Sequence, residues 1–467
     1  MSARAPSLLN RLLPFLGQQD AGLENTLPAL TGQEALDQAK LLNPDRPGLM
    51  VPTDEVTPFL WQPGPCTVLD IGSINITCLI GHPREDGTLT VSGWGWQRSE
   101  GISCGNVVDT GRAETVIRRA VGDAERRAGR RISSLYVNLS AGEPRSMRLG
   151  AEAWLSGREV TPADLRALML QARARLQGEG RYAAQCLPLF FELDGMDGIK
   201  NPLGQRCNHI RGWFLTVDSS AGALATLGDI LHRAELMPKG LVVSPLASGL
   251  SVLSAEERER GVTVVDMGAG TTSLAVFHRN RVVHTAQVKL GGYNITRDIA
   301  TRFSLPLDVA EWLKTYHGSV APGAEAGGPG IVLPPAPGRL QSRLSPAALA
   351  ATISPRLEET LELARSHLDG AGLGEAARSN IVLTGGGSLM DGAALLAARL
   401  FNRRVRTGRP RSIHNLPEGA PLSAIFSTAA GLLAWGCGAS TQYGQGDSRE
   451  KSSNFLQRLV ERFRGPL

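Results

Sequence analysis

Two stretches of the sequence, VLDIGSINITCLIG at residues 68–81 and VVDMGAGTTSLAVF at residues 264–277, share one pattern. Each is an apolar run that ends in Asp-x-Gly, continues through small or polar residues and returns as a second apolar run. Short apolar runs bounded by turn residues predict buried β-strands, so each stretch predicts a β-hairpin. The aspartates Asp70 and Asp266 lie 196 positions apart, a spacing that indicates two similar lobes rather than a short-period repeat.

The tips of the two predicted hairpins have the composition of a polyphosphate site. Glycine at a tip lets backbone N–H groups approach an anion closely, and nearby hydroxyl groups add further contacts. Asp70 and Asp266, just before the tips, suit a hydrated Mg²⁺, which keeps several waters and binds few carboxylates together with phosphate oxygens. The residues that we expect at the two tips are Gly72, Ser73, Gly268, Gly270, Thr271 and Thr272.

A third glycine-rich strand end, LTGGGSLMDG at residues 383–392, strengthens this interpretation. A single Asp-x-Gly tip is more often an ordinary tight turn than a ligand site. Two tips in matching strand contexts, followed by a third glycine-rich segment, are a much more specific pattern. The third segment suits a place where the backbone packs flat against adenine and ribose. Strands alternate with helices along the chain, which predicts an α/β fold.

These motifs resemble those of the actin-like ATPase superfamily and, within it, those of the FtsA family of bacterial cell-division proteins. The likeness extends over about residues 65–467 and does not cover the first 60 or so residues. It implies a two-lobed actin-like ATPase fold of the α/β class, with duplicated β-hairpin phosphate loops and an FtsA-type small subdomain inserted in the first lobe. The further segments that carry the likeness are GIKNPLG (198–204), SPLASGLSVLSAEERERGVTVVDMGAGT (244–271), GGYNITRDIA (291–300), AEWLKTYHG (310–318) and STAAGLLAWG (427–436).

The resemblance implies that ATP with Mg²⁺ lies between the lobes, with Asp70 and Asp266 near the metal through water. Glu311 and Lys314 match a pair that faces the ribose and adenine, and their i, i+3 spacing places both on one helical face. Taken alone, the same pair is as typical of a surface ion pair. The other matched positions are Gly72, Ser73, Gly268, Gly270, Thr271 and Thr272 in the phosphate loops, Gly291 and Gly292 as glycines that line the nucleotide, and Gly385, Gly386 and Gly387 in the adenosine motif.

The sequence departs from the family pattern at three places. Ser273 stands where many relatives have a second Asp after the loop, and Asn75 stands where a Lys is common. Leu189 and Phe190 follow Pro188 where the family often has a Gln-Glu pair. A polar side chain at that place could orient an attacking water. We therefore expect an ATP-binding protein with weak or no ATPase activity.

The strand and helix pattern, together with the resemblance, divides the chain into segments. The expected segments are a flexible N-terminal extension (1–64), the first-lobe core (65–132 and 217–255), the inserted small subdomain (133–216), the second-lobe core (256–290 and 376–438), a second-lobe accessory subdomain (291–375), a linker (439–452) and an amphipathic membrane-targeting helix (453–467). By resemblance, the inserted subdomain would serve self-association and partner contacts, and the accessory subdomain would dock the FtsZ tail.

The last residues, SNFLQRLVERFRGPL at 453–467, predict a short basic amphipathic helix. Ser453 is suited to cap its start, and Gly465-Pro466 ends it. Such a helix on a polar linker suits a membrane interface, although it could also pack on the protein or on a partner. The resemblance favours the membrane. The residues expected to contact the membrane are Phe455, Leu456, Arg458, Leu459, Val460, Arg462 and Phe463.

Composition excludes several classes of protein. The 467 residues carry 49 Lys and Arg against 44 Asp and Glu, a net charge of +5, and 42% are hydrophobic. The hydrophobic content is too high and the net charge too small for a disordered chain. The same small net charge gives too weak an electrostatic potential for a dedicated nucleic-acid binder. None of the six cysteines forms a C-x-x-C pair, so neither a zinc site nor a redox motif is supported. The apolar stretch 422–435 is shorter than the ~20 residues of a membrane span and predicts a buried helix.

By resemblance, we expect a peripheral protein on the cytoplasmic face of the inner membrane at the division septum. It would bind ATP and anionic membrane lipids, form actin-like filaments, tether the tubulin-like FtsZ through the FtsZ C-terminal tail and recruit later division proteins. One alternative is a PilM-like pilus-assembly protein, which the terminal helix after a linker disfavours. The other is a small-molecule kinase of the same superfamily, which would need a carboxylate base and a substrate pocket.

Overall fold

The structure is a computed structural model of the 467-residue chain. It describes residues 64–176, 180–321, 323–324, 329–334, 342–373, 380–417 and 424–438. The N-terminal extension up to residue 63, the linker and the terminal helix expected at 453–467 lie outside the described residues. Across the described ranges, no helix is both long and apolar enough to cross a membrane.

The first lobe is built on a six-stranded sheet with the order β11-β6-β1-β2-β3-β19. β1, β2 and β3 form an antiparallel meander, while β6 pairs in parallel with both β1 and β11. Helix α3 packs against β2 and β3 through a stripe of buried small and β-branched side chains. The elements are β1 (Cys66–Ile71), β2 (Asn75–Pro83), β3 (Leu89–Arg98), β4 (Ile102–Ser103), β5 (Asn106–Val107), α3 (Thr110–Ala128), β6 (Ser134–Leu139), α5 (Ala221–Arg233), β11 (Met237–Val243), α6 (Ser244–Val252) and β19 (Ile413–His414).

The second lobe repeats the same core arrangement in a five-stranded sheet with the order β14-β13-β12-β17-β18. β12 and β13 form an antiparallel hairpin like β1 and β2, and β17 pairs with β12 in parallel as β6 pairs with β1. The two-lobed, duplicated fold expected from the sequence is therefore confirmed. The elements are α7 (Ala255–Arg260), β12 (Val262–Met267), β13 (Thr272–His278), β14 (Arg281–Val288), β17 (Asn380–Thr384), η5 (Gly386–Leu389), α11 (Ala393–Phe401) and β18 (Val405–Thr407).

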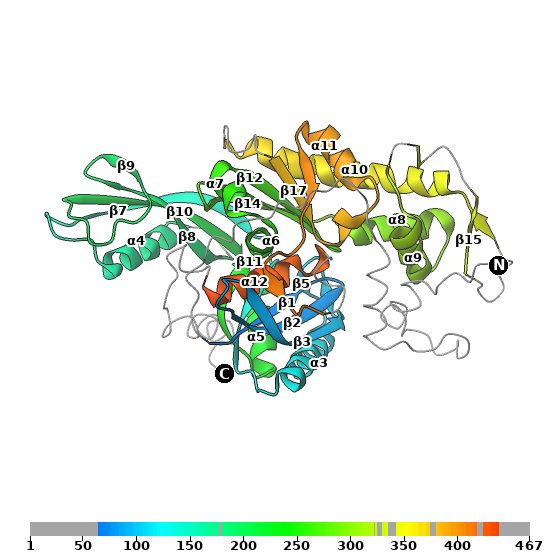
Figure 1. Cartoon of the computed structure of the whole chain (residues 1–467), viewed down its shortest axis with the longest axis horizontal. Helices are drawn as coiled ribbons and strands as arrows, with labels where there is room; N and C mark the ends of the chain where they lie inside the picture. The colour runs from blue at the N-terminus through cyan, green and yellow to red at the C-terminus, as the bar shows by residue number, and fades with distance from the viewer. Residues whose placement is uncertain are drawn as a thin grey trace.

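A smaller four-stranded sheet with the order β7-β10-β8-β9, covered by helix α4, projects away from the two lobes (Figure 1). The expected start of this subdomain at residue 133 is wrong, because β6 belongs to the first-lobe sheet and pairs with β1. Helix α4 begins with a capping box between Thr161 and Asp164, with Pro162 as its first residue. The elements are β7 (Arg145–Trp154), α4 (Pro162–Ala174), β8 (Arg181–Leu193), β9 (Met196–Ile199) and β10 (His209–Ser220).

A helical region extends the second lobe on the side opposite to this small sheet (Figure 1). Its helices pack together and share one hydrophobic core with the second-lobe sheet, to which Ile299, Leu313 and Leu357 contribute. Its first helix, α8, spans Gly292–Phe303 and follows directly after Gly291. The elements are α8 (Gly292–Phe303), α9 (Leu307–His317), β15 (Ile331–Val332), β16 (Arg343–Leu344) and α10 (Pro346–Gly370).

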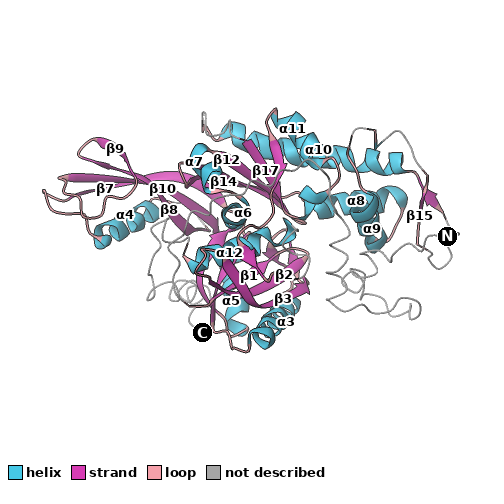
Figure 2. Cartoon of the chain, viewed as in Figure 1, coloured by secondary structure: helices cyan, strands magenta, loops and turns pink. Residues whose placement is uncertain are grey.

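Two α-helices, α6 and α12 (Ser427–Cys437), lie between the sheets of the two lobes (Figure 2). A short 3-10 helix, η7 (Ala424–Phe426), precedes α12. Helix α12 packs on α6, β1, β2 and β6, and every residue from Ala429 to Trp435 is buried. The buried helix predicted in this stretch is confirmed. Its assignment to the second lobe is wrong, because α12 packs on first-lobe strands and β19 pairs with β3.

Candidate nucleotide site between the lobes

The tips of the two hairpins have the same backbone geometry. The N–H of Gly72 donates to the carbonyl of Asn75 over 3.0 Å, and the N–H of Gly268 donates to the carbonyl of Thr271 over 2.9 Å. A Cβ on either glycine would lie 2.8 Å from that carbonyl oxygen, closer than real Cβ contacts. Only glycine fits these turns without displacement, which explains the Asp-x-Gly pattern in both hairpins.

The two tips face each other across the lobes. A Cβ on Gly270 would lie 2.5 Å from Ser73 Oγ and 2.9 Å from Cys104 Cα, so the second tip lies against the first tip and against the β4–β5 turn. The N–H of Gly105 in that turn donates to Ser73 Oγ over 3.1 Å. The sequence pattern gave no indication that this turn belongs to the site. The two predicted phosphate loops therefore lie next to each other and could bind the same ligand.

The two aspartates occupy equivalent positions on their hairpins, since Asp70 is opposite Thr77 and Asp266 is opposite Ser273. Burial, together with the nearby charge of Asp266, raises the pKa of Asp70 to about 8. Burial also raises the pKa of Asp266. The half-buried Asp70 and the buried Asp266 oppose each other's ionisation, and a divalent cation near them would favour the ionised forms.

Hydroxyl groups from the two central helices hold the Asp266 carboxylate. Ser248 on α6 donates to Asp266 Oδ2, and Thr428 on α12 donates to the same oxygen over 3.0 Å. These hydrogen bonds lower the pKa of Asp266 and so oppose part of the effect of burial. The hydroxyls fix the orientation of the carboxylate at the hairpin, a support that the sequence pattern did not reveal.

The donors at this location fit a Mg²⁺ that is bound together with phosphate. Within the described ranges no cluster of three or more His, Cys, Asp or Glu could hold a metal alone. Mg²⁺ usually takes only one or two carboxylates and completes its shell with water and phosphate oxygens. Asp70 and Asp266 would supply these carboxylates. The Thr272 hydroxyl at the second tip is buried and has no hydrogen-bond partner in the described part of the chain, which leaves it free to bind a water or phosphate oxygen.

Glu311 and Lys314 form a half-buried network rather than a surface ion pair. Lys314 Nζ lies 2.6 Å from Glu311 Oε2 and donates to the Gly292 carbonyl over 3.1 Å. It also donates to Thr296 Oγ1 over 2.9 Å, and the Thr296 hydroxyl donates to Glu311. The N–H of Gly292 donates to the Gly268 carbonyl over 3.0 Å, which links the network to the second tip.

Thr296 is the member of this network that the sequence did not indicate. We expect Thr296→Val to lower the free energy of unfolding by about 1–2 kcal/mol, because it removes a buried hydroxyl that bonds both ions. Urea unfolding followed by circular dichroism measures this change. Thr301→Val, at an exposed position on the same helix, is the matched control and should change stability by less than about 0.5 kcal/mol. Equal effects of the two substitutions would contradict this account of Thr296.

The third glycine-rich segment packs on the end of β12. Gly385 has φ of 77°, in the left-handed region, and a Cβ there would lie 2.7 Å from the Met267 carbonyl oxygen and closer still to Asp266 Oδ1. A Cβ on Gly387 would lie 2.9 Å from Met267 Cβ. Gly386 is more open, since its Cβ would have only Ile425 as a neighbour, at 3.5 Å. The segment therefore lies directly beside the second aspartate.

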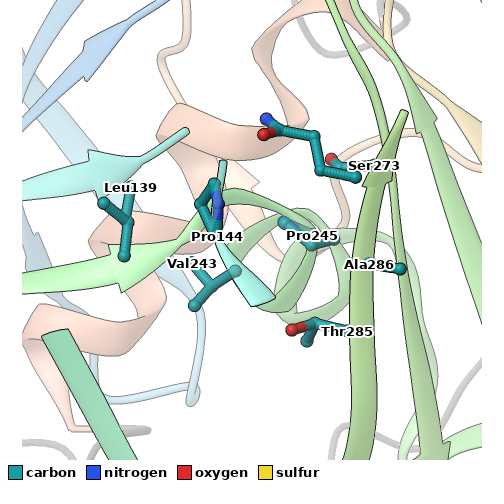
Figure 3. Close-up of a pocket in the computed structure, with 8 residues that line it drawn as sticks. Leu139, Pro144, Val243, Pro245, Ser273, Thr285 and Ala286 are labelled. Atoms are coloured by element: carbon teal, nitrogen blue, oxygen red, sulfur yellow. The ribbon is translucent and has the colours of Figure 1, made fainter. Parts of the chain in front are cut away.

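A small pocket lies behind the second hairpin, where the lobes and the inserted subdomain meet (Figure 3). Ser273 lines it together with Thr285 and Gln287 from β14, and its remaining lining is apolar or proline. The Thr285 hydroxyl is buried and has no hydrogen-bond partner in the described part of the chain. No carboxylate is among the lining residues, so this pocket contains no strong general base.

Leu189 and Phe190, which stand where the family often has a Gln-Glu pair, are packing residues in the structure. Both lie on β8 in the inserted subdomain, where Leu189 is buried in the main hydrophobic core. Phe190 packs on Trp213 with ring centroids 6.2 Å apart. Both side chains contribute to packing, and neither offers a polar group that could orient a water.

Comparison with known proteins agrees with this architecture. Residues 263–431 match the family model described as "Cell division protein FtsA", and residues 141–217 match the model described as "SHS2 domain inserted in FTSA". The chain is 37% identical over 382 residues to the cell division protein FtsA of Agrobacterium fabrum, covering 79% of this chain and 86% of that protein. The chain belongs to the FtsA family of cell-division proteins. The FtsA of Pseudomonas aeruginosa is 32% identical over 368 residues, covering 79% of this chain and 88% of that protein.

A solved structure supports the fold independently. The PilM-PilN type IV pilus biogenesis complex contains a chain that matches with a TM-score of 0.56 at 18% identity, covering 80% of this chain and 98% of that chain. At this identity the likeness concerns the fold alone. The two-lobed actin-like fold and the FtsA-type insertion are thus both present, and the sequence relatives assign the chain to the FtsA family rather than to pilus assembly.

Proposed function

We propose that this member of the FtsA family binds ATP with Mg²⁺ between its lobes and attaches FtsZ to the membrane at the division septum. The observation that carries the nucleotide part is the contact between the two glycine tips, with an aspartate behind each. Backbone N–H groups at such tips are suited to phosphate oxygens. The Glu311–Lys314 network next to the second tip would face the ribose and adenine.

We expect ATP turnover to be slow or absent. The support comes from the pocket behind the second hairpin, where Ser273, Thr285 and Gln287 are the polar lining residues. Neutral hydroxyl and amide groups can orient a water but are poor proton acceptors at neutral pH. A bound metal would supply electrophilic assistance to the phosphate, and the chain's own residues would mainly bind and orient the nucleotide.

The membrane part of the proposal rests on the sequence of the last residues. Phe455, Leu459 and Phe463 share an apolar stripe that Arg458 and Arg462 flank. Such a helix would lie in the interface, with its arginines near anionic lipid headgroups on the cytoplasmic face of the inner membrane. This location would also suit actin-like filaments that are assembled from many copies of the chain.

The partner part rests on family membership. The accessory subdomain around 291–375 would dock the C-terminal tail of FtsZ. The inserted subdomain, matched at 141–217, would serve self-association and the recruitment of later division proteins.

Co-sedimentation with liposomes tests membrane binding and FtsZ binding in one experiment. Liposomes with anionic lipids should sediment the full chain together with FtsZ, and deletion of residues 453–467 should leave both in the supernatant. Replacing Phe455, Leu459 and Phe463 by Ser within the full chain separates the apolar contribution from chain length. Liposomes of purely zwitterionic lipid are the control for charge. Unchanged sedimentation after the deletion would exclude the proposed anchor, and the absence of FtsZ from pellets that contain the full chain would exclude the tether.

A further inference from the structure

Arg98 is the last residue of β3 and lies beside the first hairpin tip. In the antiparallel pair of β2 and β3, Arg98 is directly opposite Asn75, the residue at which β2 leaves the tip. Residues opposite each other in an antiparallel pair project from the same face of the sheet with neighbouring side chains. The Ser99 N–H also donates to the Ile74 carbonyl over 2.6 Å, which fixes the end of β3 against the tip.

Most of the titratable groups near the Arg98 side chain belong to the other lobe. The titratable groups near it are Glu100 on the first lobe, Tyr293 at the start of α8, and Asp308 and Glu311 on α9. Burial lowers the pKa of Arg98, and these groups oppose that effect. The guanidinium of an arginine remains charged in proteins, so a half-buried cation of the first lobe lies near titratable groups of the second lobe.

Arg98 has unused N–H donors, whereas the donors of Lys314, the cation next to the second tip, are already in use. Lys314 already bonds Glu311, Thr296 and the Gly292 carbonyl. The Arg98 side chain makes no hydrogen bond or ion pair to any residue in the described part of the chain, although a guanidinium has five N–H donors. A partly desolvated cation without a partner is costly in free energy unless an anion binds it.

We propose that Arg98 binds the phosphate oxygens of a nucleoside triphosphate held between the two hairpin tips. This inference rests on the proposed ATP binding and assigns a cation to that site from the first lobe. The planar guanidinium of Arg98 can donate two parallel N–H bonds to phosphate oxygens. Asn75 beside it is uncharged and does not compete for the same phosphate. Because Arg98 belongs to the first lobe while α8 and α9 belong to the second, its bond to the nucleotide also draws the two lobes together.

The test is a comparison of ATP, ADP and adenosine affinities for the full chain by isothermal titration calorimetry in the presence of Mg²⁺. Arg98→Gln should weaken ATP binding about tenfold to a hundredfold, because one charge-assisted contact is lost, and should leave adenosine binding unchanged. Arg98→Lys should recover part of the loss. Arg84→Gln, in the exposed turn at the opposite end of β2 and β3, removes the same charge and should behave like the unmodified chain.

The outcomes separate the two proposals. If the unmodified chain does not bind ATP, the proposed nucleotide function fails, and this inference fails with it. If the unmodified chain binds ATP and Arg98→Gln binds it equally well, the inference alone is wrong. If Arg98→Gln lowers the affinities for adenosine and for ATP equally, the substitution acts on the structure of the site rather than on phosphate binding. That result would also overturn the inference about Arg98. Thermal unfolding without nucleotide checks that Arg98→Gln folds.

Discussion

Replacing Gly431 by valine is expected to prevent the chain from folding into its two-lobed structure. Gly431 lies on α12 where that helix crosses α6 between the two sheets (Figure 2). A Cβ at this position would lie 3.0 Å from the Cα of Ala247 and closer still to the Ala247 carbonyl carbon and oxygen. The backbones of two helices touch here, so no side-chain rotation relieves the collision.

We expect this substitution to lower the free energy of unfolding by more than about 4 kcal/mol, because both helices are buried and neither can move without opening the core. Urea unfolding followed by circular dichroism, or loss of soluble protein on expression, measures the effect. Gly122→Ala is the matched control. Gly122 lies in α3 with only Arg126 Nη1 near, at 3.6 Å, and the change should raise stability by about 0.5–1 kcal/mol. A Gly431→Val chain with unmodified stability would show that α6 and α12 are not in this contact.

Asp266→Asn is expected to reduce the affinity for Mg²⁺ and ATP together by about tenfold to a hundredfold, as the loss of a group that orients the metal does in other sites. The same change should not lower the stability of the nucleotide-free chain. Asparagine keeps an oxygen for the hydrogen bonds from Ser248 and Thr428, and it removes a buried carboxylate that raises the pKa of Asp70.

Calorimetric titration with ATP, with and without Mg²⁺, separates these effects. The loss should be large with the metal and small when EDTA removes it. Asp369→Asn, an exposed carboxylate near the end of α10, is the matched control and should bind like the unmodified chain. Equal affinities of Asp266→Asn and the unmodified chain in the presence of Mg²⁺ would exclude Asp266 from the metal site.

The local parts of the site could be predicted from the sequence because they depend on neighbouring residues. An apolar run, an Asp-x-Gly turn and a returning run are sufficient to specify a hairpin, and the same pattern at 264–277 specifies the second one. The pair Glu311 and Lys314 followed from helical spacing. These elements have nearly the expected bounds in the structure.

The remaining parts depend on residues that are distant in the sequence and adjacent only in the fold. Ser248 and Thr428 both bond Asp266, yet neither has a distinctive local pattern, and Thr428 lies 162 positions from it. The lobe to which α12 belongs is decided by packing on β1, not by proximity to β17 in the chain. The packing of Leu189 in the main core and of Phe190 against Trp213 likewise depends on strands that are distant in the sequence.

The position of α12 determines which elements would carry a mechanical force applied to the chain beyond residue 438. The described chain ends at residue 438, directly after Cys437, and a Cβ on the preceding Gly436 would touch the sulfur of Cys66 at the start of β1. The opposite end of β1 carries Asp70. Tension on the chain beyond residue 438 would therefore act along a buried helix and a central strand of the first lobe. It would reach the second lobe through contacts such as the Thr428–Asp266 hydrogen bond and the crossing of α6 and α12.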